Sequence, residues 1–194
     1  MRSVVAVRLG VLVTLVSHLF AMYLSGADAS STPISQLSRG TTGWIHTLGL
    51  LSLALAWAVL VPKLWIGNSR TSWRSGSFLL AISVPMLFYV AYYFASASDA
   101  QLFGPNANDP LSVLASVIGV AMAALLPGLR DRGISLARLN LLVLLVWIGL
   151  VPVIPLLEPS WLGAYERVVG SVLLFWTFLL SFSLDDGPTK ASRQ

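Results

Sequence analysis

Six apolar stretches, each about 20 residues long, constrain the fold of this chain more than any other feature. A helix of about 20 residues crosses the hydrocarbon core of a bilayer and satisfies its own backbone hydrogen bonds there. With 56% hydrophobic residues, 10% charged residues and a mean hydropathy of +0.80, the chain has too little polar sequence to cover a soluble globule. We therefore predict an all-α, polytopic membrane protein that forms one domain over residues 1–194. The predicted spans are about 4–24, 44–66, 76–97, 111–129, 139–157 and 161–184.

The basic residues predict the orientation of these spans, because cytoplasmic loops carry an excess of Lys and Arg. One side of the membrane would hold only Arg39 and Arg167. The other would hold Arg2, Arg8, Lys63, Arg70, Arg74, Arg130, Arg132, Arg138, Lys190 and Arg193. We therefore expect both termini in the cytoplasm. Since these residues are scattered through short loops and form no patch with aromatics, nucleic acid is not an expected partner.

The first span also has features of a signal peptide. Arg2 and Arg8 precede an apolar run that ends near Ala27-Asp28-Ala29, which resembles a signal-peptidase site. The run from Leu9 to Leu24 is long for the hydrophobic region of a signal peptide, so we expect a retained helix. Processing of a short part of the N-terminus is the alternative.

Two local patterns refine this picture of the membrane boundaries. Between the first two spans, Pro33 to Gly40 combines a proline, apolar residues three apart and a final glycine, which predicts a short interfacial helix. Tryptophans fall where spans meet an interface, as in an aromatic belt. They are Trp44, Trp65, Trp73 and Trp161.

Polar side chains within the spans favour the outer half of the predicted bundle. Tyr89, Tyr93 and Ser96 are spaced to share one face of the third helix. We expect an exterior-facing pocket bordered by the Pro33 to Gly40 segment. The remaining polar groups that the spans bring to this level include His18, His46, Tyr165, Glu166 and Arg167. The alternative is that these groups only hydrogen-bond between helices.

The polar residues in the outer half of the bundle could support several kinds of chemistry. His18 and His46 fall at similar depth, so they could ligate a haem iron, although an inter-helix hydrogen bond is the simpler interpretation. No cysteine and no HxxxH or HExxH spacing occurs, so we predict no metal site. Ser17 or Ser35 could act as a nucleophile with a histidine base, but neither lies in a G-x-S-x-G turn.

Transport is weakly supported by the sequence, because no acidic residue lies deep in a span. Asn140 is an uncharged polar residue near the start of the fifth predicted span. We expect it near the inner interface, where it would reach water.

Three segments together resemble the bacterial and archaeal six-helix membrane family catalogued as domain of unknown function 998. They are Pro33 to Trp44, Asp109 to Gly119, and Arg138 to Asn140 with the later Gly163 to Trp176 region. Gln36 stands where the family tends to have an acidic residue. Asp109, Pro110 and Ser112 stand where members often have a histidine. The resemblance implies a six-helix fold, and polar family positions that fall on Ser35, Arg39, Asp109, Tyr165 and Arg167.

The sequence thus favours a multi-pass protein of a prokaryotic plasma membrane, with a binding or accessory role. Its exterior pocket would take a lipid headgroup or small amphiphile, so membrane lipids are the expected partners and no cofactor is predicted. The alternatives are a haem-binding redox protein or membrane-embedded enzyme, and a structural subunit of a larger complex. The chain would then contact copies of itself or other membrane subunits.

Overall fold

A computed structural model describes residues 2–28, 30–96 and 109–184 of the chain, and all regular structure within them is helical. Six helices are long and apolar enough to cross a membrane. They belong to α1 (Arg2–Ser25), α2 (Gly43–Gly67), α3 (Thr71–Ser96), α5 (Asp109–Arg132), α6 (Ile134–Leu150) and α7 (Pro159–Phe182). Two short 3-10 helices, η1 (Ile34–Ser38) and η2 (Val151–Leu156), precede α2 and α7. For the described residues, the predictions of an all-helical fold and of six helices long and apolar enough to span a membrane are confirmed.

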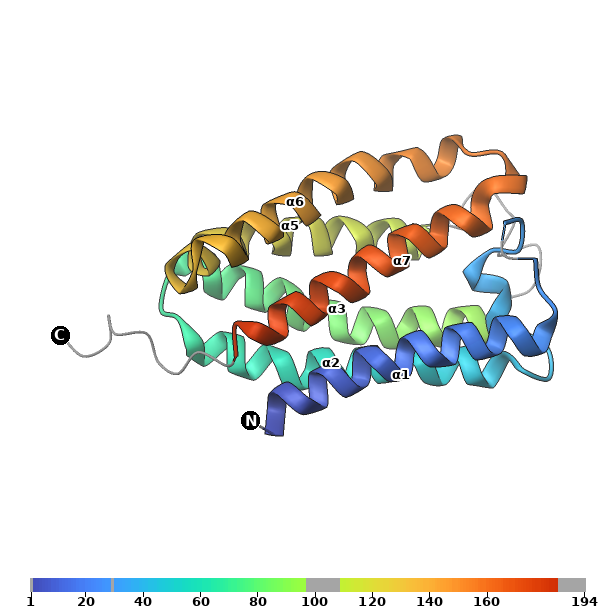
Figure 1. The fold of residues 1–194 in the computed structure, drawn as a ribbon, viewed down its shortest axis with the longest axis horizontal. Coiled ribbons are helices and arrows are strands. Elements are labelled where there is room, and N and C mark those ends of the chain that lie inside the picture. Colours follow the sequence, from blue (N-terminus) through green and yellow to red (C-terminus); the bar gives the residue numbers. More distant parts are fainter. Residues whose placement is uncertain (1, 29, 97–108, 185–194) are drawn as a thin grey trace.

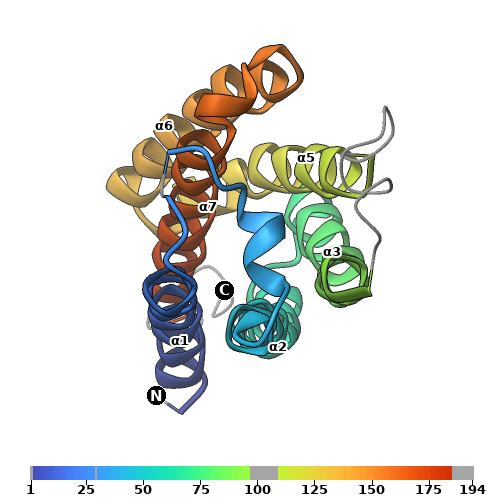
Figure 2. The same ribbon diagram turned by 90° about the vertical axis from the view of Figure 1, so that its right-hand side faces the viewer.

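The six long helices form a closed ring. Each packs against the next long helix along the chain, and α7 closes the ring by contacting both α6 and α1 (Figures 1 and 2). Large apolar side chains such as Leu55, Leu142 and Ile148 are exposed on the outside. Such a surface suits hydrocarbon rather than water.

The fifth span differs most from its predicted bounds. Residues 139–157 were predicted, whereas α6 already begins at Ile134. The α-helix ends at Leu150, and the chain continues as η2, which contains Pro152 and Pro155. Because proline lacks the amide hydrogen that continues an α-helix, this pair explains the change to a tighter helix.

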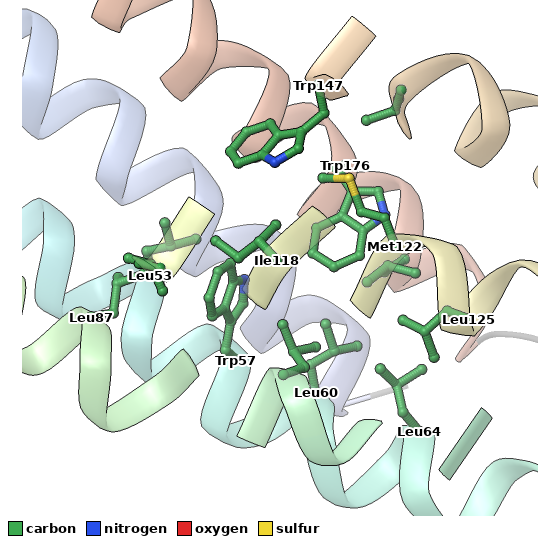
Figure 3. Packing of buried hydrophobic residues seen from close by; sticks show 14 of the residues in the cluster. Leu53, Trp57, Leu60, Leu64, Leu87, Ile118, Met122, Leu125, Trp147 and Trp176 are labelled. Atoms are coloured by element: carbon green, nitrogen blue, oxygen red, sulfur yellow. The ribbon is translucent and has the colours of Figure 1, made fainter. Parts of the chain in front are cut away.

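Tryptophans fill the middle of the ring. The rings of Trp57 and Trp176 meet edge to face with centroids 6.5 Å apart, and both are fully buried among aliphatic side chains (Figure 3). Trp57 Nε1 donates to Thr177 Oγ1 at 3.0 Å. These contacts join α2 to α7 across the ring, in the half away from η1.

Asn140 belongs to this core, so its expected access to water was wrong. Its side chain has no exposed surface. Nδ2 donates to the Met122 carbonyl at 3.0 Å, and Oδ1 accepts from Trp176 Nε1 at 2.8 Å. Because its donor and its acceptor are both used, this buried amide needs no hydrogen bond to water. It links α5, α6 and α7.

Basic residues gather at the end of the ring where α2, α5 and α7 finish. Arg70 and Asp131 form a two-point ion pair there, with Nε–Oδ2 at 2.7 Å and Nη2–Oδ1 at 3.0 Å. Arg132 lies over the Trp73 ring at 5.0 Å and donates to the Gly67 carbonyl at 3.0 Å. Trp73 is fully buried and its Nε1 donates to the Leu64 carbonyl, so its assignment to an aromatic belt was wrong.

Candidate functional site

The segment Ser30–Ser38, here called the strap, lies over the other end of the ring. Figure 2 looks onto this end and shows η1 in front of the space between the helices. This segment contains the 3-10 helix Ile34–Ser38, whose Leu37 and Ser38 are buried, and its location at a membrane interface stays a prediction. Gly40 then takes a φ of +68°, which turns the chain into α2 and is readily adopted by glycine.

Three hydrogen bonds fasten the strap to the start of α7. Ala164 N donates to Ser30 O at 2.9 Å, and Arg167 Nη1 donates to Thr32 O at 2.9 Å. Glu166 Oε2 accepts from Ile34 N at 2.6 Å. Both charged side chains are thus used to hold strap backbone groups, as charge-assisted bonds that are stronger than neutral ones.

The turn that leads into the strap is organised by Asp28. Its carboxylate accepts from the Ser30 amide at 3.0 Å and from the hydroxyls of Ser30 and Ser31. These bonds, that of the Ser30 amide first, hold the pKa of Asp28 below its usual value. The carboxylate therefore stays ionised at neutral pH and fixes the turn that follows α1.

The other end of the strap is fastened to α2. Ser38 Oγ and His46 Nδ1 are 2.7 Å apart, and both side chains are buried. A Cβ on Gly43 would lie 2.2 Å from the Ser38 carbonyl carbon and oxygen, so only glycine permits this approach. The strap is consequently held on α7 through its first half and on α2 through its second.

The two histidines meet beside the strap. Their ring centroids are 5.5 Å apart and the planes are inclined by 63°, an edge-to-face contact. Haem ligation by this pair stays a prediction. Among the described residues, no group of three or more metal-ligating side chains occurs.

A cavity of about 290 Å³ lies beneath the strap, inside the ring. Its walls are mainly apolar side chains from the six long helices. They include Leu53, Leu87, Phe94, Ile118, Trp147 and Leu174. Its polar lining includes His18, Glu166 and Arg167. The cavity therefore has the character of a site for a small, largely apolar molecule with one polar end.

The predicted site residues divide into those that reach this cavity and those that do not. His18 and Arg167 line the cavity, and the His46 ring contacts the His18 ring edge to face. Tyr165 donates its hydroxyl to the Leu150 carbonyl, which ties α7 to α6.

The third helix presents a different face to the cavity from the one expected. Tyr89 and Tyr93 stack on each other at 6.1 Å, so they do share a face. Tyr89 is 55% exposed, however, and Leu87, Val90 and Phe94 are the residues of α3 that line the cavity.

The remaining three positions lie away from the cavity or cannot be placed. Arg39 is half-buried at the end of the strap and is not among the cavity-lining residues. The side chains of Ser35 and Asp109 lie outside the part of the chain that the structure describes.

Two residues of the site were not singled out from the sequence. Glu166 was expected only as one of the polar groups at the level of the pocket. Its bond to the Ile34 amide depends on how α7 and the strap approach each other. Ser38, rather than Ser17 or Ser35, is the serine that meets a histidine. The sequence does contain a signal for the contact between Ser38 and His46. A glycine, Gly43, follows Ser38 by five residues and permits the chain to approach α2 closely.

A ring of six helices of this length and hydropathy defines a multi-pass membrane helix bundle. No protein-family model matches the chain, and no curated protein or solved structure is significantly similar to it. The resemblance to the six-helix family therefore stays an expectation, and the function is argued from the cavity.

Proposed function

We propose that the chain binds a small amphiphile in the cavity beneath the strap and serves as a binding or accessory protein. The observation that carries this proposal is the polarity of the cavity walls. Apolar side chains from all six long helices surround most of its volume, while His18, Glu166 and Arg167 bring polar atoms into it. A molecule with a hydrocarbon part and one polar end matches both regions.

The membrane is the natural source of such a molecule. A second hollow lies between α6 and α7, lined by exposed residues such as Leu142, Val146 and Phe175. Arg167 and Ser171 line both this hollow and the central cavity. The two spaces therefore adjoin along α7, which gives a lipid-soluble ligand a lateral route from hydrocarbon to the cavity.

A cavity-filling variant tests this function. A Cβ on Gly170 would meet only Ile34 Cδ1, at 3.7 Å, so Gly170→Leu adds bulk to the cavity without a backbone clash. We expect co-purified lipid, measured by native mass spectrometry of protein from nanodiscs, to fall at least about tenfold. Gly149→Leu is the matched control, because a Cβ there has no neighbour within 4 Å. Equal lipid occupancy in the wild type and both variants would contradict the proposal.

We further propose that the strap end of the ring faces the exterior of a prokaryotic plasma membrane, with both termini cytoplasmic. The support is the charge distribution: among the described residues, only Arg39 and Arg167 of the Lys and Arg residues belong to the strap end.

This orientation predicts the result of reporter fusions after Arg39, Arg70, Asp109 and Arg132. Alkaline phosphatase should be active after the first and third positions, and a cytoplasmic reporter after the second and fourth. The signs alternate because each fusion follows one more crossing of the membrane. The reverse pattern would place the cavity on the cytoplasmic side.

A further inference from the structure

The chemistry of the cavity narrows the class of amphiphile. Two sets of polar atoms near the strap bear on this class: the charged groups of Glu166 and Arg167, which hold the strap, and one imidazole nitrogen of His18. The first set determines which head-group charge suits the cavity, and the second determines which polar atom the head group needs.

The charged groups near the strap balance one another. Arg167 donates to the Thr32 carbonyl, and Glu166 accepts from the Ile34 amide. Glu166 and Asp28 both lie close enough to Arg167 to attract its guanidinium electrostatically. An anionic head would meet the Glu166 carboxylate, which also lines the cavity, while a cationic head would compete with Arg167 for it. Either charge would also lose its hydration against apolar walls, which is unfavourable when no partner compensates it.

His18 carries a ring nitrogen that makes no hydrogen bond. Its Nε2 is buried, and no hydrogen-bonding atom among the described residues reaches it. A buried polar nitrogen without a hydrogen bond is unfavourable for the folded protein, and a ligand oxygen would remove that cost. Since a neutral imidazole presents either a donor or an acceptor at Nε2, a hydroxyl satisfies both tautomers and a carbonyl satisfies one.

The size of the cavity limits the hydrocarbon part. A volume of about 290 Å³ is near the lower limit of roughly 300–1,000 Å³ for small-molecule sites. Such a space suits a single hydrocarbon chain better than the two chains of a phospholipid.

We infer that the ligand is an uncharged, single-chain amphiphile whose hydroxyl or carbonyl oxygen bonds to His18 Nε2. This inference rests on the proposed function and specifies its ligand. Monoacylglycerols and long-chain alcohols belong to this class.

Three probes with the same dodecyl-length chain test the inference on the full-length protein in nanodiscs. They are 1-monolauroylglycerol, which is neutral, dodecanesulfonate, which is anionic, and dodecyltrimethylammonium, which is cationic. Native mass spectrometry gives their relative affinities. We expect the neutral probe to bind at least about tenfold more tightly than either charged probe.

Two variants of His18 then test the hydrogen bond. His18→Leu should weaken the neutral probe about fivefold, the loss expected for one hydrogen bond, and leave the charged probes unchanged. His18→Gln keeps an amide donor and acceptor and should retain most of the affinity. Equal or tighter binding of a charged probe, or neutral binding that is unaffected in His18→Leu, would overturn the inference.

The Gly170→Leu variant separates a failure here from a failure of the proposed function. If the wild type carries lipid that is lost in Gly170→Leu, yet no neutral probe competes for it, the cavity binds amphiphiles and the assigned class is wrong. If Gly170→Leu changes no lipid occupancy and none of the probes binds, both proposals fail together.

Discussion

Asn140→Ala is expected to lower the free energy of unfolding by about 2–3 kcal/mol. The substitution leaves the buried Trp176 indole N–H without its acceptor and opens a small void between α5, α6 and α7. Side-chain hydrogen bonds between membrane helices average only about 0.6 kcal/mol, so most of the loss should come from the void and the unpaired indole. Denaturant titration in mixed micelles, followed by circular dichroism, measures the change.

The neighbouring leucine provides the control. Leu139 is 41% exposed on the outside of the ring, so Leu139→Ala should change the unfolding free energy by less than about 0.5 kcal/mol. A cycle with Trp176→Phe isolates the bond itself. If Asn140→Ala costs the same in the Trp176→Phe background, the Asn140 to Trp176 hydrogen bond contributes nothing to stability.

Gly43→Ala has the second large expected effect, and it acts on the strap. The new Cβ would lie 2.2 Å from Ser38 backbone atoms, and backbone cannot rotate away as a side chain can. We expect the strap to shift and the Ser38 to His46 hydrogen bond to break, with a loss of about 1–3 kcal/mol in local stability. Amide hydrogen exchange in residues 34–38 should then accelerate roughly five- to a hundredfold.

Two comparisons make this result specific. Gly149→Ala adds the same methyl group where no atom lies within 4 Å and should leave exchange unchanged. Ser38→Ala removes the hydrogen bond without a clash and should produce a smaller acceleration than Gly43→Ala. Unchanged exchange in Gly43→Ala would mean that the strap does not rest on α2 in solution.

The number and type of the long helices could be predicted because hydropathy over 20 residues is a property of composition alone. Burial within the bundle could not be, as Trp73 and Asn140 show. Tryptophan near a span end suits a membrane interface, and asparagine near a span end suits water. Only the positions of Arg132 over Trp73, and of Met122 and Trp176 beside Asn140, reveal that both are packed inside.

The candidate site shows the same limit. The spacing of Tyr89 and Tyr93 correctly indicates that they share a face, but spacing does not tell which way a helix is rotated. In a membrane, tyrosine is equally suited to the lipid interface and to a polar pocket. In this structure, Leu87 and Phe94 line the cavity, whereas Tyr89 and Tyr93 stack on each other and do not line it. His18 and His46 do meet, with ring centroids 5.5 Å apart, because the depth of each residue follows from the helix rise.

The closure of the ring by α7 has a consequence for how the protein is made. In chain order α7 follows the other five long helices, so the central space lacks one wall until α7 is made. Until then, the side of the space that α7 covers is open to the surrounding bilayer. Closure by α7 is therefore the step of membrane insertion at which a molecule that occupies this space becomes enclosed.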